Sequence, residues 1–132
     1  MYIIIVGGGR VGYFLAQALM DENHEVLVVE KNKPVYDSFL EMLGSICFYG
    51  DGCEATVLAE VGTGRADMLV AVTGDDEDNL IACEVAKFKF NVPHTIARLR
   101  NPSREKLFKT LGVDTTVSAT QIILESITQQ LP

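Results

Sequence analysis

The segment Gly7–Gly12 reads GGGRVG and has the spacing G-x-G-x-x-G of loops that hold the diphosphate of a nucleotide. In such a loop Gly7 permits a tight turn after a strand, Gly9 lets the backbone approach a pyrophosphate, and Gly12 lets a helix pack closely. The N–H groups at the start of that helix, at the positive end of its dipole, then bind the phosphates. The glycine spacing alone is a weak signal, so its context decides the interpretation.

An acidic residue follows the glycine loop where this chemistry requires one. Glu30 comes 18 positions after Gly12, at the end of the next apolar run. A carboxylate there accepts hydrogen bonds from both ribose hydroxyls of an adenosine and repels a 2′-phosphate. The sequence therefore favours NAD(H) or an unphosphorylated adenosine nucleotide over NADP(H). Lys31 and Lys33 weaken this preference, because either side chain could reach a phosphate.

Two arginines are candidates for further charged contacts. Arg10 lies inside the glycine loop, where it either adds charge-assisted hydrogen bonds to a β- or γ-phosphate or is a solvated surface residue. Arg98 lies near the end of an otherwise apolar run, and a charge placed there needs a partner. That partner is a phosphate, an acid such as Glu77, or a second subunit, and the sequence does not choose among them.

Other candidates follow the remaining apolar runs, because ligands of open α/β sheets bind at the carboxyl ends of the strands. Asp51 and Gly52 either border an adenine ring or form a turn in which Asp51 caps the next helix. Thr73 and Gly74 could approach a phosphate or a ribose. These residues complete a predicted cofactor site at one edge of the sheet.

The chain offers no convincing catalytic group. His24 lies in the turn before the second expected strand and His94 begins the fifth, so both stand at the opposite edge of the predicted sheet. A redox role for Cys53 has only its loop position in support, and no Tyr-x-x-x-Lys pair of the short-chain dehydrogenase kind is present. A cofactor loop without a reaction centre predicts a sensor and not an enzyme.

The elements that must position these residues alternate from end to end. Short apolar runs suit strands covered on both faces, and the segments between them have helical spacing. We expect an α/β fold of the Rossmann type, a doubly wound parallel six-stranded sheet in the order 3-2-1-4-5-6 with helices on both faces. No boundary divides residues 1–132. The expected strands are Tyr2–Val6, Val26–Val29, Ser45–Tyr49, Met68–Val72, His94–Leu99 and Thr115–Ser118. The expected later helices include Glu54–Val61, Pro102–Leu111 and Gln121–Leu131.

Composition limits the classes of partner. The formal net charge of −7 argues against nucleic acid, whose phosphates require clustered Lys and Arg. No run approaches the roughly 20 apolar residues of a membrane span, and no signal peptide is visible, so a cytosolic location is expected. The three cysteines have neither disulfide-framework nor metal-ligand spacing, and no metal site is predicted.

These motifs together resemble the TrkA N-terminal domains, also called RCK or KTN domains, which regulate potassium channels and transporters. The likeness extends over nearly the whole chain, in order and at plausible spacing. The segments that carry it are Tyr2–Gly12, Gly50–Gly52, Ala66–Thr73 with the acids and Asn79 that follow, Ala97–Arg98 and Leu111–Asp114.

The resemblance implies a ligand-gated regulator that binds NAD(H), ATP, ADP or AMP, forms homodimers and higher ring assemblies, and acts on a membrane partner. Where the family usually has Thr or Ser after its Gly-Asp-x turn, this chain has Cys53, which puts the contacts of that loop in doubt. By position, the resemblance assigns the phosphates to Gly7, Gly9, Arg10 and Val11, the ribose to Glu30, the adenine to Asp51 and Gly52, and the far side or dimer cleft to Thr73, Gly74 and Arg98.

The predicted last helix has Ile123, Ile127 and Leu131 at four-residue spacing. It either packs on its own sheet or, as the resemblance implies, crosses to a neighbouring subunit. We therefore expect a cytoplasmic nucleotide-sensing subunit or domain of a potassium transporter or channel, peripheral at the inner face of the membrane. The chain is also expected to be the N-terminal part of a longer protein. The alternatives are an NAD-dependent oxidoreductase fragment and a regulatory domain of another cation transporter or antiporter.

Overall fold

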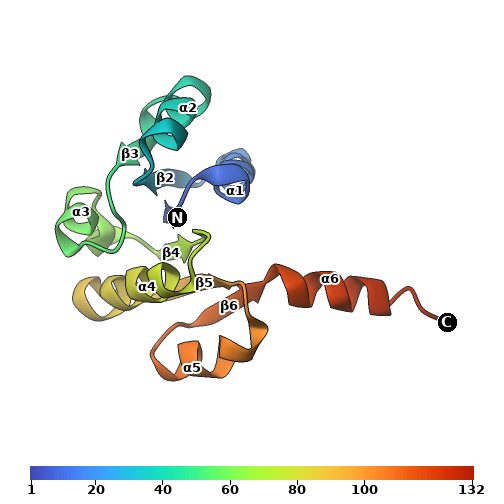
Figure 1. Cartoon of the computed structure of the whole chain (residues 1–132). Helices are drawn as coiled ribbons and strands as arrows, with labels where there is room; N and C mark the ends of the chain where they lie inside the picture. Colours follow the sequence, from blue (N-terminus) through green and yellow to red (C-terminus); the bar gives the residue numbers. More distant parts are fainter.

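Six parallel strands form one sheet in the order β3-β2-β1-β4-β5-β6, which is the order expected from the sequence. The computed structural model describes residues 1–132 (Figure 1). The winding reverses between β1 and β4, and ligands of such sheets bind at this reversal. The strands are β1 (Tyr2–Val6), β2 (Glu25–Glu30), β3 (Cys47–Tyr49), β4 (Met68–Ala71), β5 (His94–Leu99) and β6 (Thr115–Ser118).

Helices pack on both faces of this sheet, as predicted, and a last helix leaves it. Two buried clusters define the faces, because alternate residues of each strand point to opposite sides. Side chains of α1 and α2 belong to one cluster, and those of α3, α4 and α5 to the other. The helices are α1 (Gly9–Asp21), α2 (Lys33–Leu43), α3 (Ala55–Glu60), α4 (Asp76–Phe90), α5 (Glu105–Thr110) and α6 (Ala119–Thr128).

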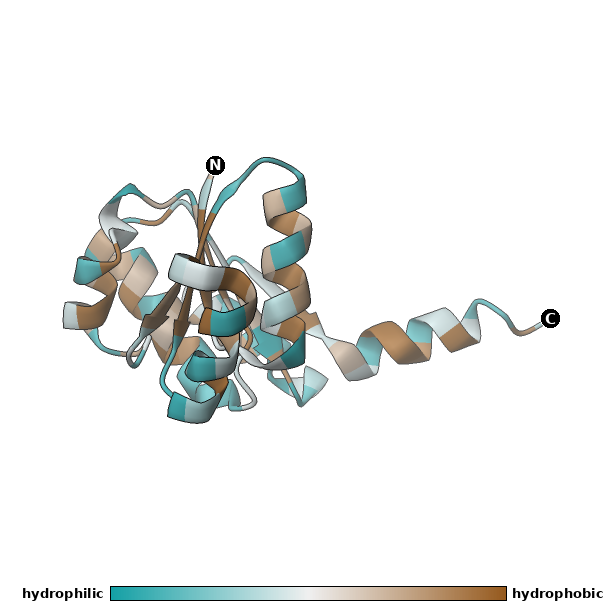
Figure 2. Ribbon diagram, turned by 90° about the horizontal axis from the view of Figure 1, so that it is seen from above, coloured by the Kyte–Doolittle hydropathy of each residue, from teal (hydrophilic) through white to brown (hydrophobic).

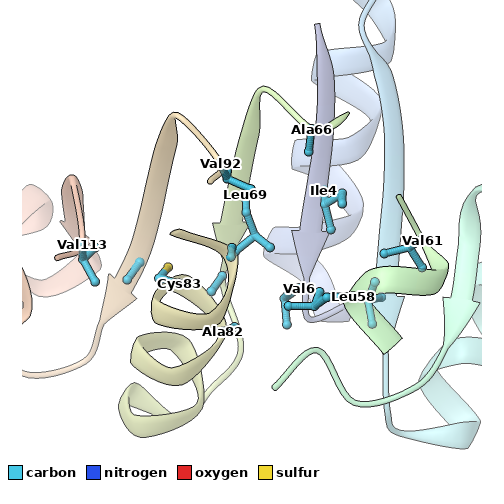
Figure 3. Close-up of a cluster of buried hydrophobic side chains, with 14 of the residues drawn as sticks. Ile4, Val6, Leu58, Val61, Ala66, Leu69, Ala82, Cys83, Val92 and Val113 are labelled. Atoms are coloured by element: carbon cyan, nitrogen blue, oxygen red, sulfur yellow. The ribbon is translucent and has the colours of Figure 1, made fainter. Parts of the chain in front are cut away.

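The larger cluster holds the sheet against α3, α4 and α5. In Figure 3, Leu58 of α3 and Ala82 and Cys83 of α4 lie beside Val6 and Leu69 of the central strands. All five side chains are at most 3% exposed. Small residues on α4 let the helix approach the sheet closely. The packing on this face therefore holds the carboxyl ends of the strands in fixed positions.

The opposite face is covered over β1 and β2 but not over β5 and β6. Along β5 burial alternates: Thr95, Ala97 and Leu99 are buried, whereas Ile96 and Arg98 are only partly buried. The helix that continues from β6 does not return over this face. Instead α6 stands apart from the body, and every one of its residues is exposed (Figures 1 and 2). The interpretation that it packs on its own sheet is therefore wrong.

Some predicted boundaries were also wrong. Gly44–Ile46 forms a short 3-10 turn, because Gly44 takes a left-handed φ of 69°, and β3 therefore begins at Cys47. Pro102–Arg104 is likewise a 3-10 turn before α5. No helix of the structure combines the length and apolar character that crossing a membrane requires.

Asp114 joins the far edge of the sheet to α4, and this gives a testable pH dependence. Its carboxylate accepts from Lys87 Nζ at 2.6 and 2.8 Å and from the N–H and hydroxyl of Thr95 at 2.9 and 3.1 Å. Burial opposes ionisation, but the bonds from Lys87 and Thr95 outweigh it and lower the pKa of Asp114. Its stabilising effect is therefore complete above the ordinary aspartate pKa and is lost as pH falls through the lower folded-state value.

We expect Asp114→Asn to lower the free energy of unfolding by about 1–2 kcal/mol at pH 7, since it weakens a charge-assisted network. The difference from wild type should shrink as the pH falls below about 4. Urea denaturation across this range measures both. Asp37→Asn removes an equal charge from an exposed pair with Lys33 and should change little at any pH. A difference that persists unchanged in acid would contradict the role of the carboxylate.

Candidate functional site

A cleft of about 740 Å³ opens at the carboxyl ends of the central strands. Its volume suits a nucleotide-sized ligand. Of the twelve residues predicted for the site, only Gly12 does not line it. The eleven others that the fold brings together are Gly7, Gly9, Arg10, Val11, Glu30, Lys31, Asp51, Gly52, Thr73, Gly74 and Arg98.

Each of the three spaced glycines lies where a larger residue would be strained or would clash, or where open space lies beside the backbone. Gly7 has a φ of 102°, and a Cβ on it would lie 2.9 Å from the amide nitrogen of Thr73. Gly9 has a φ of 64°, with open space where a Cβ would be. A Cβ on Gly12 would overlap the carbonyl oxygen of Gly7, so this glycine lets α1 begin against the strand end. Of the three, only Gly9 leaves open space where a side chain would begin.

The glycine loop and the acid of β2 are joined directly, which sequence reasoning missed. The N–H of Gly8 donates to Glu30 Oε2, and the N–H of Asn32 donates to Oε1 at 3.0 Å. A Cβ on Gly8 would lie 2.8 Å from both Glu30 Oε2 and a methyl carbon of Val35. Glu30 is only 8% exposed, yet each carboxylate oxygen keeps a further lone pair for a hydroxyl. The acid is thus fixed in place before any ligand arrives.

Backbone amides remain free at the start of α1. The first helical bond runs from the N–H of Gly12 to the carbonyl of Gly8, and no side chain caps this end. The N–H groups of Gly9, Arg10 and Val11 therefore have no acceptor in the protein. The N–H of Gly8 is not among the free donors, because Glu30 accepts it.

The two lysines near Glu30 are both engaged by acids of the chain. Lys31 Nζ lies 3.0 Å from Asp78 Oδ2, and this bond raises the pKa of Lys31. Lys33 Nζ lies 3.1 Å from Asp37, also faces the rings of Tyr36 and Tyr49, and does not line the cleft.

The turn after β3 is held by Asp51, whose Oδ1 accepts from the N–H of Cys53 at 2.9 Å. Asp51 does not cap α3, whose first turn follows Glu54 and has no side-chain cap, so that alternative is wrong. Cys53 Sγ donates to the carbonyl of Asp78 at 3.4 Å. Burial, with the nearby Asp51, raises the pKa of Cys53 to about 12, which leaves no thiolate for redox chemistry at neutral pH.

Asn79 ties together the ends of β4 and β5, and sequence reasoning gave it no role in the site. It is fully buried; its Oδ1 accepts from the N–H and hydroxyl of Thr73 at 3.0 and 2.6 Å. Its Nδ2 donates to the carbonyls of Thr73 and Arg98 at 3.1 and 3.0 Å. A buried amide with both ends satisfied positions two strand ends at once. Beside it, Gly74 faces open space.

Among the charged residues that line the cleft, the acids have hydrogen-bond partners and two arginines do not. Glu30, Asp51, Asp75 and Asp78 each accept a hydrogen bond from within the chain. The guanidinium groups of Arg10 and Arg98 have no acceptor, and Glu77 does not pair with Arg98.

Both histidines lie at the opposite edge of the sheet, as expected. His24 Nδ1 is 3.2 Å from the amino terminus of Met1, and His94 Nε2 is 2.9 Å from the hydroxyl of Thr115. Neither lines the cleft.

A doubly wound parallel sheet with a glycine loop after β1 and a buried acid at the end of β2 defines a Rossmann-type nucleotide-binding domain. The sequence profile of the TrkA-N domain matches residues 3–119, so this chain belongs to the TrkA-N domain family. A Trk system potassium uptake protein TrkA homolog of Methanothermobacter thermautotrophicus is 36% identical over 118 residues, which are 89% of this chain. They are 54% of that relative, so the chain spans about half of its length.

Solved structures share the fold. The TrkA-N domain of the inner membrane protein ybaL from Escherichia coli superposes with a TM-score of 0.89 at 19% identity, over 99% of this chain and 96% of that one. A GsuK channel bound to NAD superposes with a TM-score of 0.82 at 26% identity, over 92% of this chain and 22% of the channel chain.

Proposed function

We propose that the cleft binds an adenine nucleotide, NAD(H) or one of ATP, ADP and AMP, and that this ligand controls potassium flux through a membrane partner. The observation that carries the proposal is the charge pattern of the cleft: its acids have donors, whereas Arg10 and Arg98 have no acceptors. Unpaired guanidinium groups in the same cleft as free helix amides suit a phosphate chain.

In this arrangement Glu30 accepts from the adenosine ribose, and the phosphates lie over Gly9 against the amides of Arg10 and Val11. Asp51 and Gly52 border the adenine. Thr73, Gly74 and Arg98 line the other side, over β4 and β5. The family relationship and the NAD-bound GsuK channel support this placement. The cofactor supplies no chemistry here beyond its binding energy, which shifts the population between two conformations.

Isothermal titration of the protein with NAD⁺, NADH, NADP⁺, ATP, ADP and AMP tests the proposal. We expect saturable binding of at least one ligand without a 2′-phosphate and much weaker binding of NADP⁺, because Glu30 repels that group. Failure of all six ligands to bind would refute nucleotide sensing. Tight binding of NADP⁺ would refute the role assigned to Glu30.

Arg98 should distinguish long ligands from short ones. Neighbouring strands lie about 4.8 Å apart, so β5 ends roughly 10 Å from β1, beyond the first phosphate of an AMP whose ribose is at Glu30. We expect Arg98→Gln to weaken ATP or NAD⁺ about 10-fold or more, since one charge-assisted interaction is lost, and to change AMP less than 2-fold. Arg104→Gln removes an equal charge outside the cleft and should leave all affinities unchanged. An equal loss for AMP would contradict this assignment.

The chain also carries two apolar surfaces that suit a homodimer. Ile122, Ile123, Leu124 and Ile127 of α6 are each about half exposed, and the face of β5 and β6 beside them is uncovered. We propose that α6 of each copy crosses to the other, and that dimers join in rings. Such an assembly converts ligand-dependent hinge angles into movement of a potassium transporter or channel. We further propose that the protein acts in the cytoplasm, at the inner face of the membrane, as a regulator and not as an enzyme.

Potassium transport should respond to the glycine loop in cells. We expect Gly9→Asp to abolish nucleotide control of rubidium uptake, because a carboxylate would occupy the open space proposed for phosphate. Gly44→Asp is the matched control: Gly44 also has a left-handed φ and open space around it, but lies outside the cleft. Equal defects from both substitutions would indicate general misfolding and contradict the phosphate site.

A further inference from the structure

We propose that Asp78 helps to exclude ligands with a 2′-phosphate by holding the ammonium group of Lys31. This inference rests on the proposed nucleotide site. It assigns a role to Asp78, an acid that was not among the residues predicted for that site. Both residues line the cleft and come from different elements: Lys31 follows β2, and Asp78 lies in the first turn of α4. Their side chains meet at 3.0 Å.

Lys31 stands where a 2′-phosphate would need a cation. It is the residue after Glu30, the proposed ribose ligand, and its backbone therefore follows the same strand end. In dinucleotide sites a positive side chain near the ribose accommodates the 2′-phosphate. A free Lys31 would thus offset the repulsion from Glu30. Lys33, the other nearby lysine, is turned toward Asp37 and away from the cleft.

Asp78 is well placed to keep Lys31 engaged. Its N–H donates to Asp75 Oδ1 at 3.0 Å, and its carbonyl accepts from Cys53 Sγ at 3.4 Å. The backbone of Asp78 is therefore fixed on two sides, and its side chain is 29% exposed against 56% for Lys31. Asp78 is therefore the fixed member of the pair, and the longer and more exposed side chain of Lys31 extends to reach it. Asp51 adds negative charge on the same side.

A 2′-phosphate entering the cleft would therefore meet two carboxylates and a cation that already has a partner. Breaking the pair to use Lys31 would leave Asp78 unpaired beside the incoming dianion. Glu30 acts on the 2′ position by its own charge, whereas Asp78 acts through Lys31. Asp78 is in this sense a positioning residue for specificity, and it contributes nothing to the recognition of an unmodified ribose.

The test compares AMP with adenosine 2′,5′-bisphosphate, which differ only in the 2′-phosphate. Titrations use wild type, Asp78→Asn, Lys31→Gln and the double variant. We expect Asp78→Asn to improve bisphosphate binding relative to AMP about 5-fold, since it frees one cation and removes one repulsive charge. Adding Lys31→Gln should abolish most of that gain, whereas Lys31→Gln alone should not raise the ratio, because Asp78 then stands unpaired beside the 2′-phosphate.

Glu77→Gln is the control for charge alone, because it removes an equal charge one residue away and outside the cleft. We expect it to leave the affinity ratio unchanged. An equal gain with Glu77→Gln, a gain in Asp78→Asn that survives Lys31→Gln, or an unchanged ratio in Asp78→Asn would overturn the inference. Failure of wild type to bind either ligand would overturn the proposed function and this inference with it. Normal AMP binding with an unaltered ratio would overturn this inference alone.

Discussion

Replacing Glu30 by alanine is expected to weaken every adenosine ligand of this protein by about 100-fold or more. In the proposed site the carboxylate of Glu30 accepts two hydrogen bonds from ribose hydroxyls. Hydrogen bonds to a charged group contribute roughly 1.5–3 kcal/mol each. The same carboxylate accepts the amides of Gly8 and Asn32. Its removal thus also frees the glycine loop and the start of α2. Isothermal titration with the best wild-type ligand measures the loss.

The matched control is Glu25→Ala, at the other end of the same strand. Glu25 pairs with Arg65 at the surface, and its loss should leave nucleotide affinity unchanged. Ligand variants separate the lost ribose contact from a loosened loop: 2′,3′-dideoxy-ATP lacks both hydroxyls. Wild type should prefer ATP to the dideoxy compound, and Glu30→Ala should bind both equally weakly. A preference for ATP that survives in Glu30→Ala would show that the ribose is recognised elsewhere.

The fold was open to prediction because each of its elements has a local signal. β1 is a continuous apolar run, and the glycine that follows it can adopt the left-handed φ that ends the strand. α2 begins after Asn32, whose side chain accepts from Val35, with a proline in its first turn. Such patterns depend on neighbours in the chain, so one sequence suffices to find them. The strand order followed because alternating strands and helices allow few topologies.

The contacts that organise the cleft were not predictable in the same way. Asn79 reaches Thr73 across a turn and Arg98 across to the next strand, and Lys31 meets Asp78 over 47 positions of sequence. Nothing in the local sequence pattern distinguishes an acid that accepts a hydrogen bond from a distant residue from one that is merely solvated. The run of acids at the start of α4 indicates from sequence only that negative charge suits a helix N-terminus, whereas Asp76 in fact accepts from the N–H of Arg100 at 2.7 Å.

Because α6 has no packing partner within the chain, we expect it to hold a dimer together. An isolated amphipathic helix of ten residues is marginal in water, so packing is needed to stabilise it. Within one chain α6 does not pack on the sheet, although the adjoining face of β5 and β6 exposes Val117 and leaves Ile96 half-buried. A twofold exchange of helices satisfies both surfaces, because each copy then supplies what the other lacks. We therefore expect a dimer at micromolar concentration.

Ile123→Asp combined with Ile127→Asp should convert that dimer to a monomer. Burial of each isoleucine contributes about 1.5–3 kcal/mol, and twofold symmetry counts each substitution twice, so dissociation should become at least 1,000-fold easier. Sedimentation velocity reports the change. Gln121→Asp with Thr128→Asp puts the same charges on the opposite side of α6 and should leave the dimer intact. Since α6 makes no core contact, the monomer should keep its AMP affinity and lose at most the helical circular dichroism of α6 itself. A variant that stays dimeric would contradict the exchange of helices.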